Sequence, residues 1–159
     1  MTTVFADPVN FNAYHPLKNE WTLWYDCPSK KINEHNWTQN LKNLTNFKTI
    51  EDFWGVINNI VPSNELSLGA NYHIFKSGIK PMWEDPNNER GGRLSISFQK
   101  STGDRINDIW LQSLAFTIGA NFEHDDEICG IIFSNRKVCF RISLWLKSYE
   151  NRDATETIA

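Results

Sequence analysis

The sequence CFRISLWLK, residues 139–147, alternates strictly between apolar and other side chains, and this alternation constrains the fold more than any other feature. Successive side chains of a β-strand point to opposite faces, so the apolar positions share one face. They are Phe140, Ile142, Leu144 and Leu146. The opposite face is polar except for one tryptophan, and it carries Arg141, Ser143, Trp145 and Lys147. The apolar run before it, ICGIIFSNR, predicts the partner strand of a hairpin, and therefore an antiparallel sheet with two unlike faces.

Further strands and helices are predicted around this hairpin. Alternation predicts strands over EWTLWY, NYHIFKS and RLSISFQK. Apolar residues at helical spacing predict a helix over TIEDFWGVINNIV, with Thr49 as its N-cap, and another over DRINDIWLQSLAFTIG, which ends at Gly119. NRDATETIA begins a third helix. The pattern predicts an α+β fold in which helices cover one face of the sheet. The other face would be wet and would carry Arg93, Arg141 and Trp145.

Composition excludes several classes of protein. The 159 residues suit one domain, which we place at residues 15–159 after a short flexible lead over residues 1–14. A net charge of −3 argues against a protein that coats nucleic acid through a basic surface. Three cysteines without a CxxC or Cys/His spacing predict neither a disulfide framework nor a zinc site. No apolar run is long enough to cross a membrane, so we expect a soluble intracellular protein without cofactor or metal.

Two tryptophans fall in predicted loops. Trp83 stands beside Glu84 in GIKPMWEDPNNERGGR, and Trp37 ends the polar stretch that begins DCPSKK. Two rings can sandwich a flat heterocycle, at about 1–3 kcal/mol per ring, and a cationic heterocycle is attracted more strongly. A glutamate can accept two hydrogen bonds from a guanine edge, and arginines bind phosphate oxygens. The alternative is a packed tryptophan beside a solvated turn at Glu84 and Asp85, and the residues taken singly leave both open.

Six segments together resemble one known family. They are HPLKNEWTLWY, NWTQNL, TIEDFWGVINNI, YHIFKSGIKPMWED, ERGGR and EICGIIFSNR. In order and spacing they are similar to eukaryotic translation initiation factor 4E, the mRNA cap-binding protein, from about His15 to the last residue. SGIKPMWED followed by GGR is the most specific part of the resemblance. The fold that it implies is a curved antiparallel sheet with helices on its convex face and the cap in its concave face.

The resemblance also implies which residues bind the cap. The two loop tryptophans would sandwich 7-methylguanine, the glutamate would accept hydrogen bonds from its N1–H and 2-amino group, and a third tryptophan would lie near the N7-methyl group. The base would be bound by Trp37, Trp83, Glu84 and Trp145, and the phosphates by Arg93, Arg136 and Arg141.

A second site is implied on the convex, dorsal side. In the family, the counterpart of Trp54 receives helical peptides that carry Tyr, then four residues, then Leu and another apolar residue. The groove would comprise His15, Pro16, Leu17, Ile50, Trp54, Leu111 and Ala115. The partners implied are the scaffold initiation factor 4G and repressors of the 4E-binding-protein type. From the residues alone, Trp54 lies in an amphipathic pattern, which favours a core position instead.

The chain departs from the family pattern at several positions. The loop before Trp37 is longer, which predicts a looser first ring of the sandwich. Val138 stands where a basic residue is often found, and Gln112 where the partner groove usually has a glutamate. Family members continue the last helix and add a strand, whereas this sequence stops inside that helix. We therefore expect an exposed apolar patch and a lower stability than that of a longer relative.

The resemblance predicts a binding module that recognises the 7-methylguanosine 5′-triphosphate cap of mRNA and recruits factor 4G to initiate translation. One alternative is a cap-binding translational repressor, although tryptophan in both rings of the sandwich favours the initiation factor. Another is a partner-binding form whose cap affinity is weakened by the missing end. An enzyme is least favoured, because hydrolysis needs a metal cluster or an acid–base pair. The expected location is cytoplasmic, with a nuclear one left open and no membrane partner.

Overall fold

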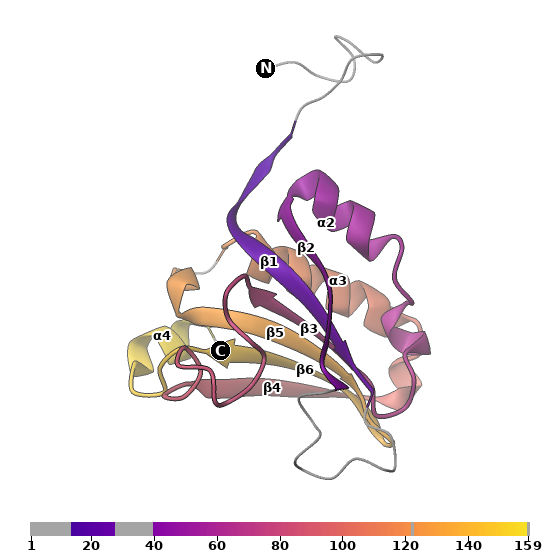
Figure 1. Cartoon of the computed structure of the whole chain (residues 1–159). Coiled ribbons are helices and arrows are strands. Elements are labelled where there is room, and N and C mark those ends of the chain that lie inside the picture. The colour runs from indigo at the N-terminus through magenta and orange to yellow at the C-terminus, as the bar shows by residue number, and fades with distance from the viewer. Residues whose placement is uncertain (1–13, 28–39, 122, 159) are drawn as a thin grey trace.

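The fold is one open antiparallel sheet with helices against one of its faces (Figure 1). The computed structural model describes residues 14–27, 40–121 and 123–158. The strands, in the spatial order β2-β1-β3-β5-β6-β4, have the bounds β1 Pro16–Asp26, β2 Lys42–Thr49, β3 Asn71–Lys76, β4 Gly92–Gln99, β5 Ile128–Asn135 and β6 Cys139–Leu146. The α-helices are α2 Ile50–Ile57, α3 Arg105–Ile118 and α4 Arg152–Ile158. Short 3₁₀ turns lie at Ser63–Glu65, Lys100–Thr102 and Asp125–Glu127.

The predicted hairpin is confirmed, and its strands are the fourth and fifth of the six in spatial order. β5 and β6 pair antiparallel, with Phe133 opposite Ile142 and Ser134 opposite Arg141. The other predicted strands also form, as β1, β3 and β4. β2 was not predicted, because KNLTNFKT is mostly polar and an edge strand needs few buried side chains. Only its Phe47 and Thr49 are buried.

The main core lies between the sheet and helices α2 and α3, which share its convex face (Figure 1). Thr49 caps α2 as predicted, since its Oγ1 accepts a hydrogen bond of 3.1 Å from the N–H of Asp52. Phe53 is the buried residue of α2. The buried residues of α3 recur with helical spacing and are Ile106, Trp110, Leu114, Thr117 and Ile118.

Helix α4 covers one end of the same convex face. Its Ala154 and Ile158 are buried in a small cluster with Ile128 and Leu146, next to Leu94. The third predicted helix is therefore confirmed. Residues 1–13 of the predicted flexible lead lie outside the described residues.

The concave face is less wet than predicted. Trp145 is only 4% exposed, because its ring packs edge-on against Phe75, with 5.6 Å between centroids, and stacks on Trp83 at 3.9 Å. The expectation of a solvent-exposed Trp145 was therefore wrong. Trp145 is buried because the β3–β4 loop folds back over this end of the concave face. Strand alternation does not reveal where that loop lies. Arg93 is exposed, and Arg141 is half-buried.

None of the helices in the described part of the chain is long and apolar enough to span a bilayer.

Candidate functional site

A polar cavity of about 280 Å³ opens on the concave face, between the sheet and the β3–β4 loop. Strands β1, β3, β4, β5 and β6 all contribute to it. Its lining includes every described residue that the sequence analysis assigned to cap binding, namely Trp83, Glu84, Arg93, Arg136, Arg141 and Trp145. The seventh, Trp37, lies outside the described residues. Residues that are 62 positions apart in the chain are thus brought to one cavity.

The β3–β4 loop, residues 77–91, is held in shape by two buried polar side chains. Asn88 is 0% exposed, and its Nδ2 donates to the carbonyls of Lys80 (2.7 Å) and Met82 (2.8 Å). Asp85 accepts from the N–H of Lys80 at 2.8 Å and from the N–H of Asn87 at 2.9 Å. These bonds lie on both sides of Trp83 in the chain, so the loop presents it from a fixed frame.

The same hydrogen bonds decide the charge of Asp85. Burial by itself would raise the pKa of this carboxyl, but the N–H groups of Lys80 and Asn87 stabilise the carboxylate and lower the pKa below its usual value. Asp85 is therefore ionised at neutral pH. It holds the loop from within, whereas the neighbouring Glu84 is exposed and lines the cavity.

Trp83 presents an aromatic face to this cavity. Its indole lies nearly parallel to that of Trp145, with an interplanar angle of 26°, and 46% of its surface remains exposed. Trp145 packs against the sheet side of Trp83, and Phe75 packs in turn against Trp145. Gly130 on β5 leaves room for the Phe75 ring, because a Cβ added to Gly130 would lie 2.4 Å from that ring. The stack offers a flat ligand a further layer on the free side of Trp83.

The three arginines of the cavity differ in how much they are already engaged. Arg136 donates from its guanidinium to the carbonyl of Gly69 at 3.0 Å and to Oδ1 of Asn71 at 2.9 Å. Arg141 makes one long contact, 3.4 Å from Nε to Oγ of Ser97. Arg93 lies across from Trp145 in the β4–β6 register. The arginines on β4 and β6 thus have more donors available for an anionic ligand.

Sequence reasoning missed the polar floor of the cavity. Asp26, Asn71 and His73 line it, and all three are buried. Asp26 lies opposite Asn71 in the β1–β3 register. The available signal was strand parity, since Asp26 follows Trp24 at spacing two and His73 follows Asn71 likewise. Their meeting required the pairing of β1 with β3, which the sequence does not state.

Metal and thiol chemistry find no support in the described part of the chain. No group of three or more His, Cys, Asp or Glu residues there could hold a metal ion. Cys27, Cys129 and Cys139 are free thiols. Burial raises the pKa of the Cys129 thiol to about 11, although Lys76 and Lys147 act in the opposite direction, so this group stays protonated at neutral pH.

The residues of the predicted dorsal groove gather around the start of α2 and the outer side of α3. The N–H of Ile50 donates to the carbonyl of His15 at 2.9 Å, and His15 Nδ1 lies 2.6 Å from Oε1 of Glu51. Trp54 is 43% exposed and Ile50 is 42% exposed. The core position that amphipathicity favoured for Trp54 was therefore wrong. Pro16 and Ala115 are exposed as well, and Leu17 and Leu111 are half-buried.

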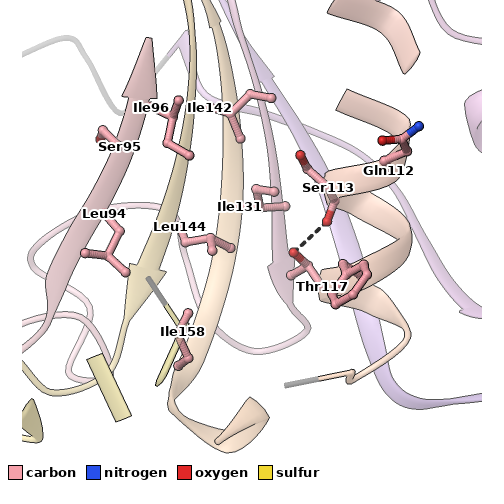
Figure 2. A pocket seen from close by; sticks show the side chains of 11 residues that line it. Leu94, Ser95, Ile96, Gln112, Ser113, Thr117, Ile131, Ile142, Leu144 and Ile158 are labelled. Atoms are coloured by element: carbon pink, nitrogen blue, oxygen red, sulfur yellow. Dashed lines mark hydrogen bonds between the residues drawn. The ribbon is translucent and has the colours of Figure 1, made fainter. Parts of the chain in front are cut away.

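A second and larger cavity, of about 460 Å³, lies on the convex face between α3 and the strands β4, β5 and β6 (Figure 2). The strand side chains that point into it are Leu94, Ile96, Ile131, Ile142 and Leu144, and Ile158 of α4 lies at one end. Ile96 is 61% exposed and Phe116 is 56% exposed. We name this feature the convex groove. The lining of the convex groove is mostly apolar.

The comparisons with known proteins agree with this geometry. The family model described as eukaryotic initiation factor 4E matches residues 16–159. The chain is 43% identical over 148 residues to eukaryotic translation initiation factor 4E of Candida albicans, which covers 91% of this chain and 70% of that protein. The Dictyostelium discoideum factor is 41% identical over 144 residues, covering 91% of this chain and 57% of that protein. The chain thus spans between 57% and 70% of the length of these two curated relatives.

Solved structures give the same result. The chain is similar to Ascaris suum eIF4E-3 in complex with the m7G cap, with a TM-score of 0.87 and 36% identity over 92% of this chain and 81% of that one. It is also similar to Caenorhabditis elegans (C. elegans) eIF4E-3 in complex with the 4E-binding protein Mextli and a cap analog. The TM-score is 0.85 and the identity 35%, over 92% of this chain and 82% of that one. The predicted fold, a sheet with helices on one face, is thereby confirmed.

Proposed function

This chain belongs to the eukaryotic initiation factor 4E family, and from that premise we propose that it binds the 7-methylguanosine cap of mRNA in its concave cavity. The observation that carries the proposal is that one cavity collects an exposed indole face, a carboxylate at its rim and arginines on neighbouring strands. A stacked cationic base, a hydrogen-bonded guanine edge and a triphosphate need these three kinds of group.

We assign the roles residue by residue. Trp83 stacks on the base from one side, and Trp37 is the proposed second ring of the sandwich. Glu84 accepts the hydrogen bonds of the guanine N1–H and 2-amino groups. The phosphates meet the arginines, with Arg93 and Arg141 freer to reorient than Arg136, which is held by Asn71. Trp145 supports the base site from beneath Trp83.

The dorsal groove is the proposed site for protein partners. Trp54 and Ile50 give an exposed apolar surface on α2, and a helical peptide with apolar residues on one face would cover it. We propose factor 4G and repressors of the 4E-binding-protein type as partners, and initiation of translation in the cytoplasm as the process served. A solved relative, the schistosome factor, is in complex with both m7GpppA and 4E-BP, which supports simultaneous use of the two sites.

The test of cap binding is a pair of titrations followed by intrinsic tryptophan fluorescence. The full chain is titrated with 7-methyl-GTP and, separately, with GTP. We expect strong quenching by 7-methyl-GTP and at least tenfold weaker binding of GTP, because only the methylated base is cationic. Equal affinity for the two nucleotides, or no response to either, would contradict the proposal.

A translational repressor is the second candidate, because the same cavity and the same dorsal groove would serve it. The two functions differ in which protein partner the chain binds while it holds capped RNA. Addition of the chain to a cap-dependent translation extract depleted of its own cap-binding factor separates them. An initiation factor restores translation of a capped reporter, whereas a repressor leaves it low and lowers it further in an undepleted extract.

A further inference from the structure

A buried acid–imidazole pair lies on the floor of the concave cavity, outside the set of residues assigned above. Asp26 at the end of β1 is 1% exposed, and His73 on β3 is 4% exposed. His73 Nε2 lies 2.5 Å from Oδ1 of Asp26. Both residues line the same cavity as Trp83 and Glu84. The cavity therefore contains two carboxylates at different depths, Glu84 at the exposed rim and Asp26 at the buried floor.

Asp26 is held as a carboxylate by a chain of donors. Nδ2 of Asn71 lies 2.9 Å from Oδ1 and 3.0 Å from Oδ2 of Asp26. The Oδ1 of Asn71 in turn accepts from the guanidinium of Arg136 at 2.9 Å. This last bond fixes which way the amide of Asn71 faces, so its N–H₂ group points at Asp26. Asp26 therefore has two side-chain hydrogen-bond partners in the described part of the chain, the amide of Asn71 and the imidazole of His73.

The other nitrogen of His73 decides the charge of the pair. Nδ1 is buried and has no hydrogen-bond partner among the described residues. A proton on Nδ1 would be a buried donor without an acceptor, which is costly, whereas an unprotonated Nδ1 leaves only an unused lone pair. The proton of a neutral ring therefore sits on Nε2, where it is donated to Asp26. The pair carries a net charge of −1, located on Asp26.

The charges that face this pair come from each element around the cavity. Arg136 follows β5 and is engaged with Asn71 and Gly69. Arg141 on β6 and Arg93 on β4 line the cavity from the far strands, and Glu84 lines it from the loop. Asp26 lies on the β1–β3 side of the cavity, joined to Arg136 through Asn71, while Arg93 and Arg141 lie on the β4–β6 side.

We propose that the Asp26–His73 pair is a specificity determinant of the cavity, a fixed negative charge that favours a cationic heterocycle over its neutral counterpart. This inference rests on the proposed function, in which the heterocycle is 7-methylguanine. It assigns a different task to each carboxylate. Glu84 reads the hydrogen-bonding edge of the base, which the methylated and unmethylated nucleotides share. Asp26 responds to the charge of the ring, in which they differ.

The first test compares the affinities of wild type and Asp26→Asn for 7-methyl-GTP and for GTP by tryptophan fluorescence. The substitution keeps the shape and removes the charge. We expect the ratio of the two dissociation constants to fall about tenfold, the effect of one charge at roughly 10 Å in an effective dielectric constant of about 20. A variant that is folded and keeps the wild-type ratio overturns the inference.

Asp125→Asn is the matched control. Asp125 is also a buried carboxylate, 8% exposed, and it accepts from Lys18 Nζ at 2.6 Å, but it does not line the cavity. We expect this variant to keep the wild-type ratio. A similar fall in both variants would assign the effect to net charge and overturn the inference. If wild type binds neither nucleotide, the proposed function fails as well, whereas a wild-type preference that survives in Asp26→Asn defeats this inference alone.

A second test does not depend on ligand binding. The imidazole nitrogens of His73 are observed by two-bond ¹H–¹⁵N NMR of the unliganded wild-type chain at neutral pH, with the signals assigned by their loss in His73→Gln. We expect the pattern of a neutral ring protonated on Nε2. A doubly protonated ring would make the pair neutral overall and would overturn the inference, whatever the result for Asp26→Asn.

Discussion

The concave cavity and the convex groove lie on opposite faces of the same strands, but the first is lined mainly by polar and aromatic side chains and the second mainly by apolar ones. The concave cavity, about 280 Å³, is lined by carboxylates, arginines and tryptophans, and its floor is braced by hydrogen bonds such as those of Asn71. The convex groove, about 460 Å³, has no charged side chain among the described residues that line it (Figure 2). On β6, Arg141, Ser143 and Trp145 face the first, and Ile142 and Leu144 face the second.

The difference teaches how each face relates to binding. The buried polar groups on the floor of the concave cavity, such as Asp26 and Asn71, are held in position before a ligand arrives, so a ligand that contacts them does not have to order them. The exposed apolar side chains of the convex groove do not stabilise the fold, because burying them would be more favourable than leaving them in water. The concave cavity can therefore select a ligand by its polar groups. The convex groove could only favour a ligand by burying apolar surface.

The largest effect is expected in the main core on the same side of the sheet as the convex groove. Leu114 on α3 is fully buried, and Leu114→Ala should lower the free energy of unfolding by about 2–5 kcal/mol. Ile96→Ser, at the 61% exposed rim of the convex groove, should change it by no more than about 0.5 kcal/mol and should reduce the binding of an apolar dye. Urea denaturation measures both. A large loss of stability in Ile96→Ser would show that the convex groove is closed in solution.

The next effect concerns the packing beneath the concave cavity. Gly130→Ala places a Cβ at 2.4 Å from the Phe75 ring and 2.7 Å from the carbonyl oxygen of Ile74, which should cost about 1–3 kcal/mol. Gly55→Ala is the matched control: nothing lies within 4 Å of its added Cβ, and in the exposed helix α2 it should stabilise by about 0.5–1 kcal/mol. Thermal unfolding of the two variants should therefore shift in opposite directions.

A third prediction separates the two faces by their exposed tryptophans. Trp83 and Trp54 are similarly exposed, at 46% and 43%. Trp83→Ala should weaken 7-methyl-GTP binding by roughly 10- to 100-fold through the loss of about 1–3 kcal/mol of stacking. Trp54→Ala should leave that affinity unchanged and weaken the binding of a helical partner peptide. Calorimetric titration of each variant with both ligands completes the comparison, and equal loss of cap affinity in the two variants would contradict it.

The smallest effect lies at the start of α2. Two hydrogen bonds from His15 to Glu51 lower the pKa of that carboxyl to about 2 from an ordinary value of 4.5. The imidazole contributes more than the backbone N–H. Because the folded value is the lower one, the stabilising effect is complete above about pH 4.5 and is lost as the pH falls towards 2. In His15→Ala the pKa should move back towards 4.5. An NMR titration of the Glu51 side chain measures both values, and an unchanged pKa in the variant would remove the His15 imidazole as the main cause.

Trp83 and Trp145 show how far prediction from sequence could reach. A stretch rich in proline and glycine places Trp83 in a loop from local information alone, but whether its ring is packed or exposed was left open, and the structure shows it 46% exposed. Trp145 was harder. Its strand parity correctly placed it on the concave face, but its burial depends on a loop that ends 54 residues before it and on Phe75 from another strand.

The sequence by itself determined the division of this protein into two faces. Alternation with period two assigns each side chain of a strand to one face, and helical spacing does the same for α3, because both are properties of the local backbone. Only the tertiary structure decided what meets on each face. The pairing of Asp26 with His73, the burial of Trp145 and the polar edge strand β2 all follow from which strand lies beside which. That choice is made by contacts between residues distant in the chain, for which a single sequence contains no local signal.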